Sequence, residues 1–172
     1  VIGSSGAIGS AFVDHYINDQ SINSIFSFSR SSIGIDNNKV KHFSIDIENE
    51  NSVQDAAKSV EEINFDEIII ASGLLHTNDF GPEKSIKDLK ADNILKILNV
   101  NTVGPAIIGK HFLPLLNKNN KSVMAFLSAR VGSISENKLG GWYAYRASKS
   151  ALNQIIKTFS IELKRTNPKA II

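Results

Sequence analysis

The 172-residue sequence contains no cysteine, which excludes disulfide bonds and thiolate metal sites within it. It also lacks any apolar run close to the roughly 18 residues that a membrane-spanning helix needs. No stretch has the order of basic, apolar and small residues that is typical of a signal peptide. We therefore expect a cytoplasmic protein that does not bind membranes.

An excess of charge of one sign is missing as well. The 19 basic and 17 acidic residues leave a net charge of +2, and no basic run exceeds two residues, so nothing indicates a nucleic-acid partner. The four histidines fall in different predicted elements without ligand-like spacing, and we predict no metal site. Apolar residues make up 42% of the chain, which is enough for one globular domain over residues 1–172.

Short β-branched runs alternate with helical spacings of apolar residues. This alternation predicts an α/β fold, a doubly wound (Rossmann) parallel sheet with helices on both faces. Pro105 should kink the third helix. Residues 30–39 should form a loop or a short helix, and residues 73–88 a connection. We expect strands at residues 1–2, 25–29, 40–45, 65–71 and 122–128, and helices at 7–19, 52–63, 92–116 and 143–164.

Both ends of the chain read as incomplete strands. The sequence opens on Val1-Ile2 and stops on Ala170-Ile171-Ile172. We therefore expect the fold to be truncated at both ends, with C-terminal strands and a substrate loop missing.

A glycine-rich turn follows the first strand directly and opens the first helix. Small residues there let the backbone approach a pyrophosphate, and free N–H groups at the helix N-terminus stabilise its negative charge. A tight turn without a ligand is the alternative interpretation. The residues predicted to bind a pyrophosphate-containing cofactor here are Gly3, Ser5, Gly6, Ile8 and Gly9.

The end of the second strand distinguishes the two nicotinamide cofactors. An acidic residue about 20 positions after the turn would bind the ribose of NAD, but the sequence here is Phe28-Ser29-Arg30. A cation at this place suits the 2′-phosphate of NADP. We therefore predict that Ser29 and Arg30 bind NADP(H) in preference to NAD(H); a solvent-exposed arginine is the alternative.

Tyr145 and Lys149 lie four residues apart at the start of the last predicted helix, so both side chains share one face. A free tyrosine has a pKa of about 10 and exchanges protons poorly at neutral pH. A nearby ammonium group favours the phenolate, so we expect Lys149 to lower the pKa of Tyr145 towards the range of acid–base catalysis. The same spacing also occurs by chance in many proteins.

Five motifs in order and spacing resemble the short-chain dehydrogenase/reductase family. The segment over residues 140–153 is most similar to the C-factor-like carbonyl reductases within it. The motifs are the turn Gly3–Gly9, the pair Asp46-Ile47, the triplet Ala71-Ser72-Gly73, Asn101, and Tyr145-x-x-x-Lys149.

The resemblance implies an oxidoreductase that transfers hydride between NADP(H) and a carbonyl or alcohol. Tyr145 would be the general acid or base, Lys149 would bind the nicotinamide ribose, and Asn101 would hold a water for proton relay. Cofactor contacts would come from Asp46 and Ile47 at the adenine and from Ala71, Ser72 and Gly73. Family members commonly form homodimers or homotetramers through the long helix and the helix carrying the tyrosine.

Two departures from the family pattern keep other functions open. The spacing Gly3, Gly6, Gly9, with Ala7 where a glycine is usual, is typical of extended sugar-nucleotide epimerases and dehydratases. The family's substrate-binding serine corresponds to Ala129. Ser128 or Ser133 would replace it, and we assign Ser128. Ala129 in the place of the serine also motivates an alternative function, a non-catalytic NADP(H) sensor.

Overall fold

The sheet of this protein is entirely parallel. The computed structural model describes residues 1–32 and 34–172. Ile2 bridges β1 at Phe28 and β3 at Ile70, which gives the order β2-β1-Ile2-β3-β4-β5. The chain thus starts in the middle of the sheet, runs to one edge and returns to the other side, as in a doubly wound fold. The strands are β1 (Ile25–Ser29), β2 (Val40–Ser44), β3 (Glu67–Ile70), β4 (Ser122–Phe126) and β5 (Ala170–Ile171).

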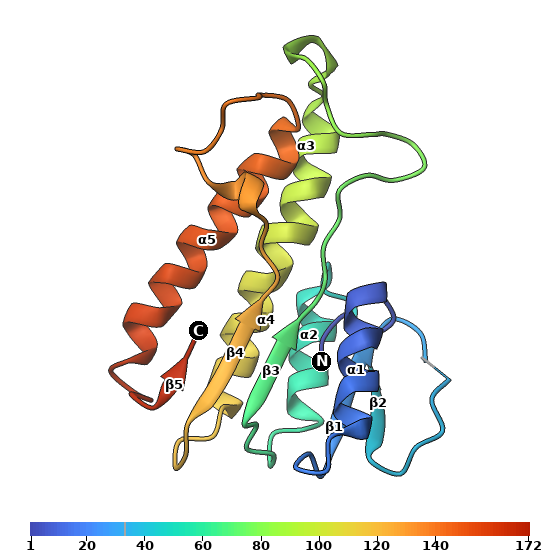
Figure 1. Cartoon of the computed structure of the whole chain (residues 1–172), viewed down its shortest axis with the longest axis vertical. Helices are drawn as coiled ribbons and strands as arrows, with labels where there is room; N and C mark the ends of the chain where they lie inside the picture. Colours follow the sequence, from blue (N-terminus) through green and yellow to red (C-terminus); the bar gives the residue numbers. More distant parts are fainter. Residues whose placement is uncertain (33) are drawn as a thin grey trace.

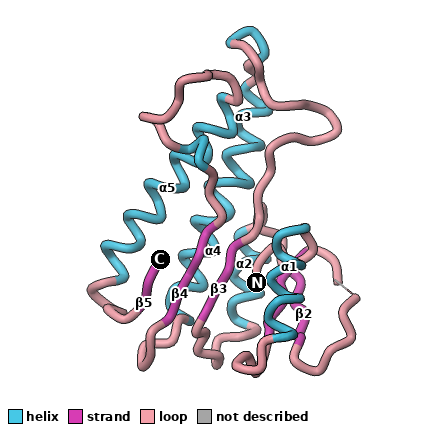
Figure 2. The backbone as a smooth tube through the Cα atoms, in the orientation of Figure 1, coloured by secondary structure: helices cyan, strands magenta, loops and turns pink. Residues whose placement is uncertain are grey.

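Helices cover both faces of the sheet (Figures 1 and 2). Helix α1 (Ala7–Asn18) lies on one face, whereas α2 (Glu50–Lys58), α4 (Gly104–Phe112) and α5 (Tyr143–Leu163) lie on the other. The central strands are buried on both sides, which explains the uninterrupted apolar run of β3. The predicted fold class is confirmed.

The core lies between the sheet and the α2–α4 layer. Phe28 of β1 meets Phe112 of α4 edge to face, with ring centroids 5.4 Å apart. Gly109 of α4 allows close contact with α5, because a Cβ atom there would lie 2.4 Å from the Phe159 ring. These contacts fix α5 relative to the strands, and its N-terminal half extends beyond their carboxyl ends (Figure 1).

The long predicted helix is divided at the expected place. It consists of α3 (Ala91–Leu98), a π-helical turn (Asn99–Val103) and α4. Pro105 lacks the N–H that would bond the Asn101 carbonyl in an α-helix, and the Gly104 N–H bonds the Asn99 carbonyl five residues back. The proline therefore coincides with a local change of helix type at Asn101.

Several predicted boundaries are wrong by a few residues. Helix α2 starts earlier than residue 52 because the Asn49 side chain caps it, accepting from the N–H groups of Asn51 and Ser52. It also stops before residue 63, at Lys58. Strands β2, β3 and β4 end one or two residues earlier than predicted, since their last residues turn into the loops of the site described below, and β3 also starts two residues later, at Glu67. Ile33, within the expected loop over residues 30–39, lies outside the described residues.

Three short 3₁₀ helices complete the described elements, at Ile86–Asp88, Leu113–Leu115 and Arg130–Gly132. The first ends the predicted connection over residues 73–88. The last follows β4 and packs against α5, because a Cβ on Gly132 would lie 2.9 Å from the Lys149 Cβ. No helix among the described residues is long and apolar enough to span a membrane.

Candidate active site

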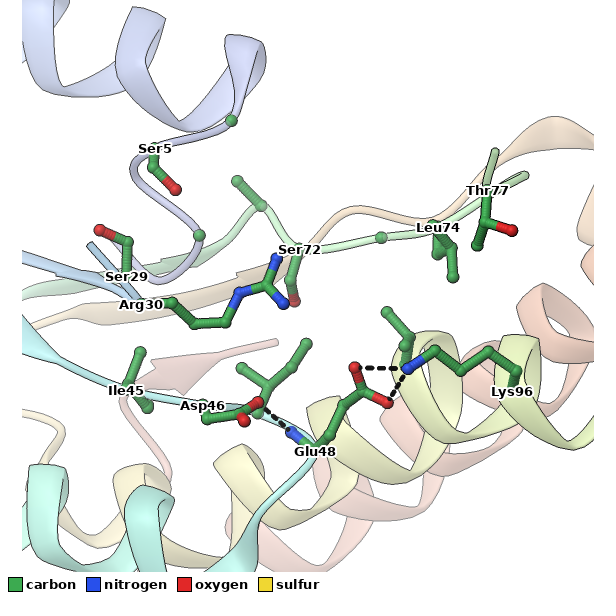
Figure 3. A pocket seen from close by; sticks show the side chains of 16 residues that line it. Ser5, Ser29, Arg30, Ile45, Asp46, Glu48, Ser72, Leu74, Thr77 and Lys96 are labelled. Atoms are coloured by element: carbon green, nitrogen blue, oxygen red, sulfur yellow. Dashed lines mark hydrogen bonds and ion pairs between the residues drawn. The ribbon is translucent and has the colours of Figure 1, made fainter. Parts of the chain in front are cut away.

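A pocket of about 390 Å³ opens beyond the carboxyl ends of the central strands (Figure 3). In open α/β sheets, ligands bind in the crevice at this edge, where the strand order reverses. Ten of the predicted cofactor-binding residues line it: Gly3, Ser5, Gly6, Ser29, Arg30, Asp46, Ile47, Ala71, Ser72 and Gly73.

The glycine-rich turn is shaped by close backbone contacts. Gly3 has φ +86°, and a Cβ there would lie 2.9 Å from the Ser72 nitrogen. A Cβ on Gly9 would lie 2.1 Å from the Gly3 carbonyl oxygen, so only glycine fits without rearrangement. Gly9 therefore shapes the turn without lining the pocket.

The turn also presents free donors. Within the described residues, the backbone N–H groups of Ser5, Ala7 and Ile8 have no backbone acceptor. These groups sit at the N-terminus of α1, where the helix dipole favours an anion. The Ile8 side chain is exposed and does not line the pocket, so any contact of Ile8 with a cofactor would come from its backbone.

Arg30 is a cation whose side chain extends into the pocket. Its side chain crosses the pocket towards Ser72 (Figure 3), and no salt bridge among the described residues involves it. Ser29 is buried and its hydroxyl donates to the Ser31 carbonyl at 2.6 Å. Arg30 is thus available to an anionic group, whereas the Ser29 hydroxyl stabilises the loop.

The opposite wall follows β2. The Asp46 carboxylate accepts from the Glu48 N–H at 3.1 Å, and Ile47 packs against Gly104, where a Cβ would lie 2.9 Å from the Ile47 carbonyl. Glu48 forms an ion pair with Lys96 of α3 at 2.6 Å. The loop carrying Asp46 and Ile47 is therefore tied to the long helix.

The pocket suits a phosphate-bearing dinucleotide. The Ser72 hydroxyl is buried and has no hydrogen-bond partner among the described residues, although a buried polar group normally has one. It lies on the pocket wall beside Arg30 and the glycine-rich turn. An elongated ligand with acceptor oxygens would satisfy Ser72, the free N–H groups and Arg30 together.

Lys149 and Tyr145 lie together on α5, next to this pocket. Lys149 is 2% exposed, and its ammonium group donates to the Leu127 carbonyl at 2.8 Å. The Lys149 Nζ atom is 5.7 Å from the centroid of the Tyr145 ring. A Cβ on Gly73 would be 3.6 Å from Lys149 Nζ. Because Gly73 lines the pocket, the lysine lies at the edge of the pocket.

Burial sets the pKa values of this pair. It lowers the pKa of Lys149, because the charged form loses solvation, and it raises the pKa of Tyr145 for the same reason. The expected lowering of the Tyr145 pKa by Lys149 is therefore wrong for this structure. Tyr145 therefore stays protonated through neutral pH.

Asn101 is fixed by the π-helical turn. Its amide donates to the Leu74 carbonyl at 2.8 Å and to the Ser148 hydroxyl at 3.1 Å, and its oxygen accepts from the Leu74 N–H at 2.7 Å. A Cβ on Gly73 would be 3.7 Å from this oxygen. Asn101 Oδ1 and Lys149 Nζ thus border the same space beside Gly73.

The serine candidates bond elsewhere. The Ser128 hydroxyl donates to Asn153 Oδ1 at 2.6 Å, and Asn153 lies two helical turns after Tyr145. Ser133 contacts the Ser135 hydroxyl at 3.3 Å. Neither serine hydrogen-bonds Tyr145 within the described part of the chain, and Ala129 has no hydroxyl.

Sequence reasoning missed six residues that line the pocket: Ile45, Glu48, Leu74, Thr77, Lys96 and Val100. Glu48 and Lys96 are 48 positions apart, so no local pattern indicates their ion pair. Leu74 and Thr77 directly follow the predicted triplet at residues 71–73, and extending that motif along the strand-end loop would have found them.

Comparisons with known proteins agree with this geometry. The sequence model of the short chain dehydrogenase family matches residues 1–171. The chain is 28% identical to 1-hydroxy-2-glutathionyl-2-methyl-3-butene dehydrogenase of Rhodococcus sp. (strain AD45), over 74% of the chain and 54% of that protein. It is 31% identical to C-signal of Myxococcus xanthus, over 46% of the chain and 48% of that protein. The chain spans about half the length of the curated relatives it matches.

A solved structure shows the same fold. The NADPH-bound carbonyl reductase from chicken fatty liver superposes with a TM-score of 0.83, covering 97% of this chain and 74% of its own, at 20% identity. The match over nearly all residues, together with the parallel sheet and the pocket at its carboxyl edge, confirms the expected resemblance: this chain belongs to the short-chain dehydrogenase family of oxidoreductases.

Proposed function

We propose that the protein is an NADP-dependent carbonyl reductase that interconverts a carbonyl compound and its alcohol. The observation that carries the proposal is the adjacency of a buried Lys149, the ring of Tyr145 and a pocket built for phosphate groups. The NADPH-bound carbonyl reductase that shares the fold supports the choice of cofactor and reaction.

The pocket residues would bind NADP(H) along its length. The free N–H groups of the turn would bind the pyrophosphate, and Arg30 the 2′-phosphate. Asp46 and Ile47 would contact the adenine, and Lys149 would bind the nicotinamide ribose. Bound there, the cofactor would supply the hydride, and the protein would supply the proton.

Tyr145 would donate that proton to the carbonyl oxygen. With a pKa above the ordinary value of 10.0, the phenol is protonated at neutral pH, so the acid form is present when reduction begins. Proton donation by a well-placed side chain accelerates such steps by about 10² to 10⁴. In alcohol oxidation, the same oxygen would accept the proton.

Lys149 and Asn101 would return a proton to Tyr145. Lys149 Nζ and Asn101 Oδ1 border the same space beside Gly73, where a water would bridge them. Lys149 is also a weaker base than an exposed lysine because burial lowers its pKa, and this makes proton transfer from it easier. We propose Ser128 as a second donor to the substrate oxygen, which requires its hydroxyl to leave Asn153.

A non-catalytic NADP(H) sensor is the second candidate. Ala129 lacks a hydroxyl, and the neighbouring Ser128 hydroxyl is engaged by Asn153. In that function the pocket would bind NADP(H) and the substrate side would remain unused.

One titration separates the two functions. Full-length protein is titrated with NADPH and with NADH while nicotinamide fluorescence is followed, and a mixed panel of aldehydes and ketones is then added. The reductase predicts tighter binding of NADPH followed by its oxidation. Binding without oxidation supports the sensor, and no binding of either cofactor contradicts both.

We also propose that the protein forms a homodimer or homotetramer through the long helix and α5. Large apolar side chains are exposed there, with Leu95 63% exposed on α3, Val103 49% in the π-helical turn and Ile161 49% on α5. Gel filtration with light scattering should give at least twice the mass of one chain, and a monomer would contradict this proposal.

A further inference from the structure

The segment that precedes α5 has an unusual backbone. Gly140, Gly141 and Trp142 all have left-handed conformations, with φ of +66°, +65° and +53°. Trp142 is the only residue other than glycine with positive φ among the described residues. A side chain at Cβ makes this conformation unfavourable, and the few residues that tolerate it are usually asparagine or aspartate.

Neither conformational preference nor burial explains a tryptophan at this position. Glycine would relieve the backbone, and the Trp142 side chain remains 39% exposed. Non-glycine residues held in such conformations cluster at functional sites, where the surrounding structure enforces them. The contacts of this residue therefore indicate what the conformation achieves.

Hydrogen bonds on both sides hold Trp142 in place. Its N–H donates to the Glu83 carbonyl at 2.6 Å, and its own carbonyl accepts from the Arg146 N–H at 2.8 Å. The buried Glu83 carboxylate accepts from the Ala144 N–H at 3.3 Å, and Arg146 Nε donates to the Gly141 carbonyl at 3.0 Å. The backbone that carries the indole is thus fixed to the loop after β3 and to α5.

This anchoring places the indole beside the proposed proton donor. The rings of Trp142 and Tyr145 meet edge to face, with centroids 6.3 Å apart and an angle of 78° between their planes. Lys149 also lies near Tyr145, with its Nζ atom 5.7 Å from the centroid of the Tyr145 ring. The partly exposed indole therefore borders the space next to Tyr145.

We propose that Trp142 forms one wall of the substrate site and favours carbonyl compounds that carry an aromatic or similarly flat apolar group. This inference rests on the proposed reductase function. A carbonyl oxygen bonded to the Tyr145 hydroxyl would direct its substituent along the neighbouring indole. Flat rings gain both apolar burial and favourable ring geometry from such a contact, whereas a short aliphatic chain gains little.

The ratio of kcat/KM for benzaldehyde to that for propanal tests the proposal in full-length protein with NADPH. Trp142→Ala should lower this ratio about tenfold, which corresponds to the free energy that one aromatic contact contributes. Trp142→Phe should retain most of it. The matched control is Tyr143→Ala, because Tyr143 is equally exposed at 39% and should leave the ratio unchanged. An unchanged ratio in Trp142→Ala would overturn the proposal.

Trp142→Gly separates a substrate contact from a packing role. It removes the ring and suits φ +53°, so its Tm should be no lower than that of the wild type while the ratio falls. A lower Tm together with a retained ratio would show that the indole only packs, and this result would overturn the proposal.

A binding readout keeps this inference distinct from the proposed function. Trp142 is the single tryptophan of the sequence, so the difference in emission between wild type and Trp142→Phe reports on it. Benzyl alcohol added to the NADP⁺ complex should quench this emission. Quenching without turnover of any aldehyde would remove the reductase function and leave an aromatic-binding wall, whereas turnover of benzaldehyde without quenching would overturn the role of Trp142.

Discussion

The glycine-rich turn and the N-terminal half of α5 border adjacent parts of the site but present different chemical groups to it. The turn uses backbone atoms and small residues, packed so closely that a Cβ on Gly9 would lie 2.1 Å from the Gly3 carbonyl. Helix α5 uses ionisable side chains, with Lys149 2% exposed beside Tyr145. In the proposed function, the turn would bind the cofactor through its shape and its N–H groups, and α5 would transfer protons.

This difference determines how each region should respond to substitution. Side chains added to the turn collide with backbone, which cannot move without disturbing the strand ends, so binding and stability should fall together. Removing a polar atom from α5 should abolish proton transfer and should also remove the free-energy cost of burying that atom. Activity should therefore fall while the fold persists.

The largest effect is expected from Tyr145→Phe. Loss of the hydroxyl should lower kcat by about 10² to 10⁴, while the affinity for NADPH should change little because the proposed function places the hydroxyl against the substrate and not the cofactor. Steady-state kinetics and a fluorescence titration measure the two quantities. Tyr143→Phe is the control, and a Tyr145→Phe enzyme with full activity would contradict the assignment.

Gly9→Ala should be the most damaging change in the turn. Its Cβ would force the turn away from α1, with a cost of about 1 to 3 kcal/mol in the free energy of unfolding and weaker NADPH binding. Urea unfolding and titration test both. In Gly81→Ala the added Cβ meets no atom within 4 Å, and this variant should retain both properties.

Arg30→Ala should change cofactor choice. Removal of the free guanidinium should weaken NADPH binding by about 10-fold or more, as expected for a charged hydrogen bond, with little effect on NADH. The exposed Arg165 provides the control variant, Arg165→Ala. Equal weakening for the two cofactors would show that Arg30 does not bind the 2′-phosphate.

Lys149→Met should change how the stability of the protein depends on pH. Because burial lowers the pKa of Lys149 below its ordinary value of 10.5, the unfolded chain takes up the proton first as the pH falls. The wild type therefore loses stability at this site as the pH falls below 10.5, and the variant does not. Lys149→Met should therefore raise the free energy of unfolding, relative to the wild type, by more at pH 7 than above pH 10.5. Lys157→Met, at an exposed position of α5, should show no such pH dependence.

The smallest effect is expected from Ser128→Ala. Its hydroxyl is bonded to Asn153 at 2.6 Å, so it must exchange partners before it can donate to a substrate. We expect kcat/KM to fall by less than about tenfold, which corresponds to the loss of one neutral hydrogen bond. A loss as large as that in Tyr145→Phe would show that Ser128 is a primary donor, and Ser133→Ala is the comparison.

The two regions also differ in what the sequence reveals. The turn is visible because its glycines lie within seven residues of one another and follow a strand, and ten of the predicted residues do line one pocket. The spacing of Tyr145 and Lys149 is visible for the same reason. Local patterns carry these features because backbone geometry alone relates the residues.

Features that depend on distant segments were not predictable. The ion pair between Glu48 and Lys96 joins a loop to α3 across the pocket. The pKa of Tyr145 is raised because tertiary packing buries it, whereas the sequence offered only the nearby lysine and indicated the opposite direction. The engagement of Ser128 by Asn153 likewise follows from the packing of the loop after β4 on α5.

Transfer of deuterium from NADPH labelled at the nicotinamide C4 position tests the central claim most directly. Full-length protein is incubated with the labelled cofactor and a carbonyl panel, and the alcohols are analysed by mass spectrometry. The proposed reductase predicts one deuterium on the former carbonyl carbon with wild-type protein and almost none with Tyr145→Phe. NADPH binding without labelled alcohol from any carbonyl would contradict it and favour the sensor.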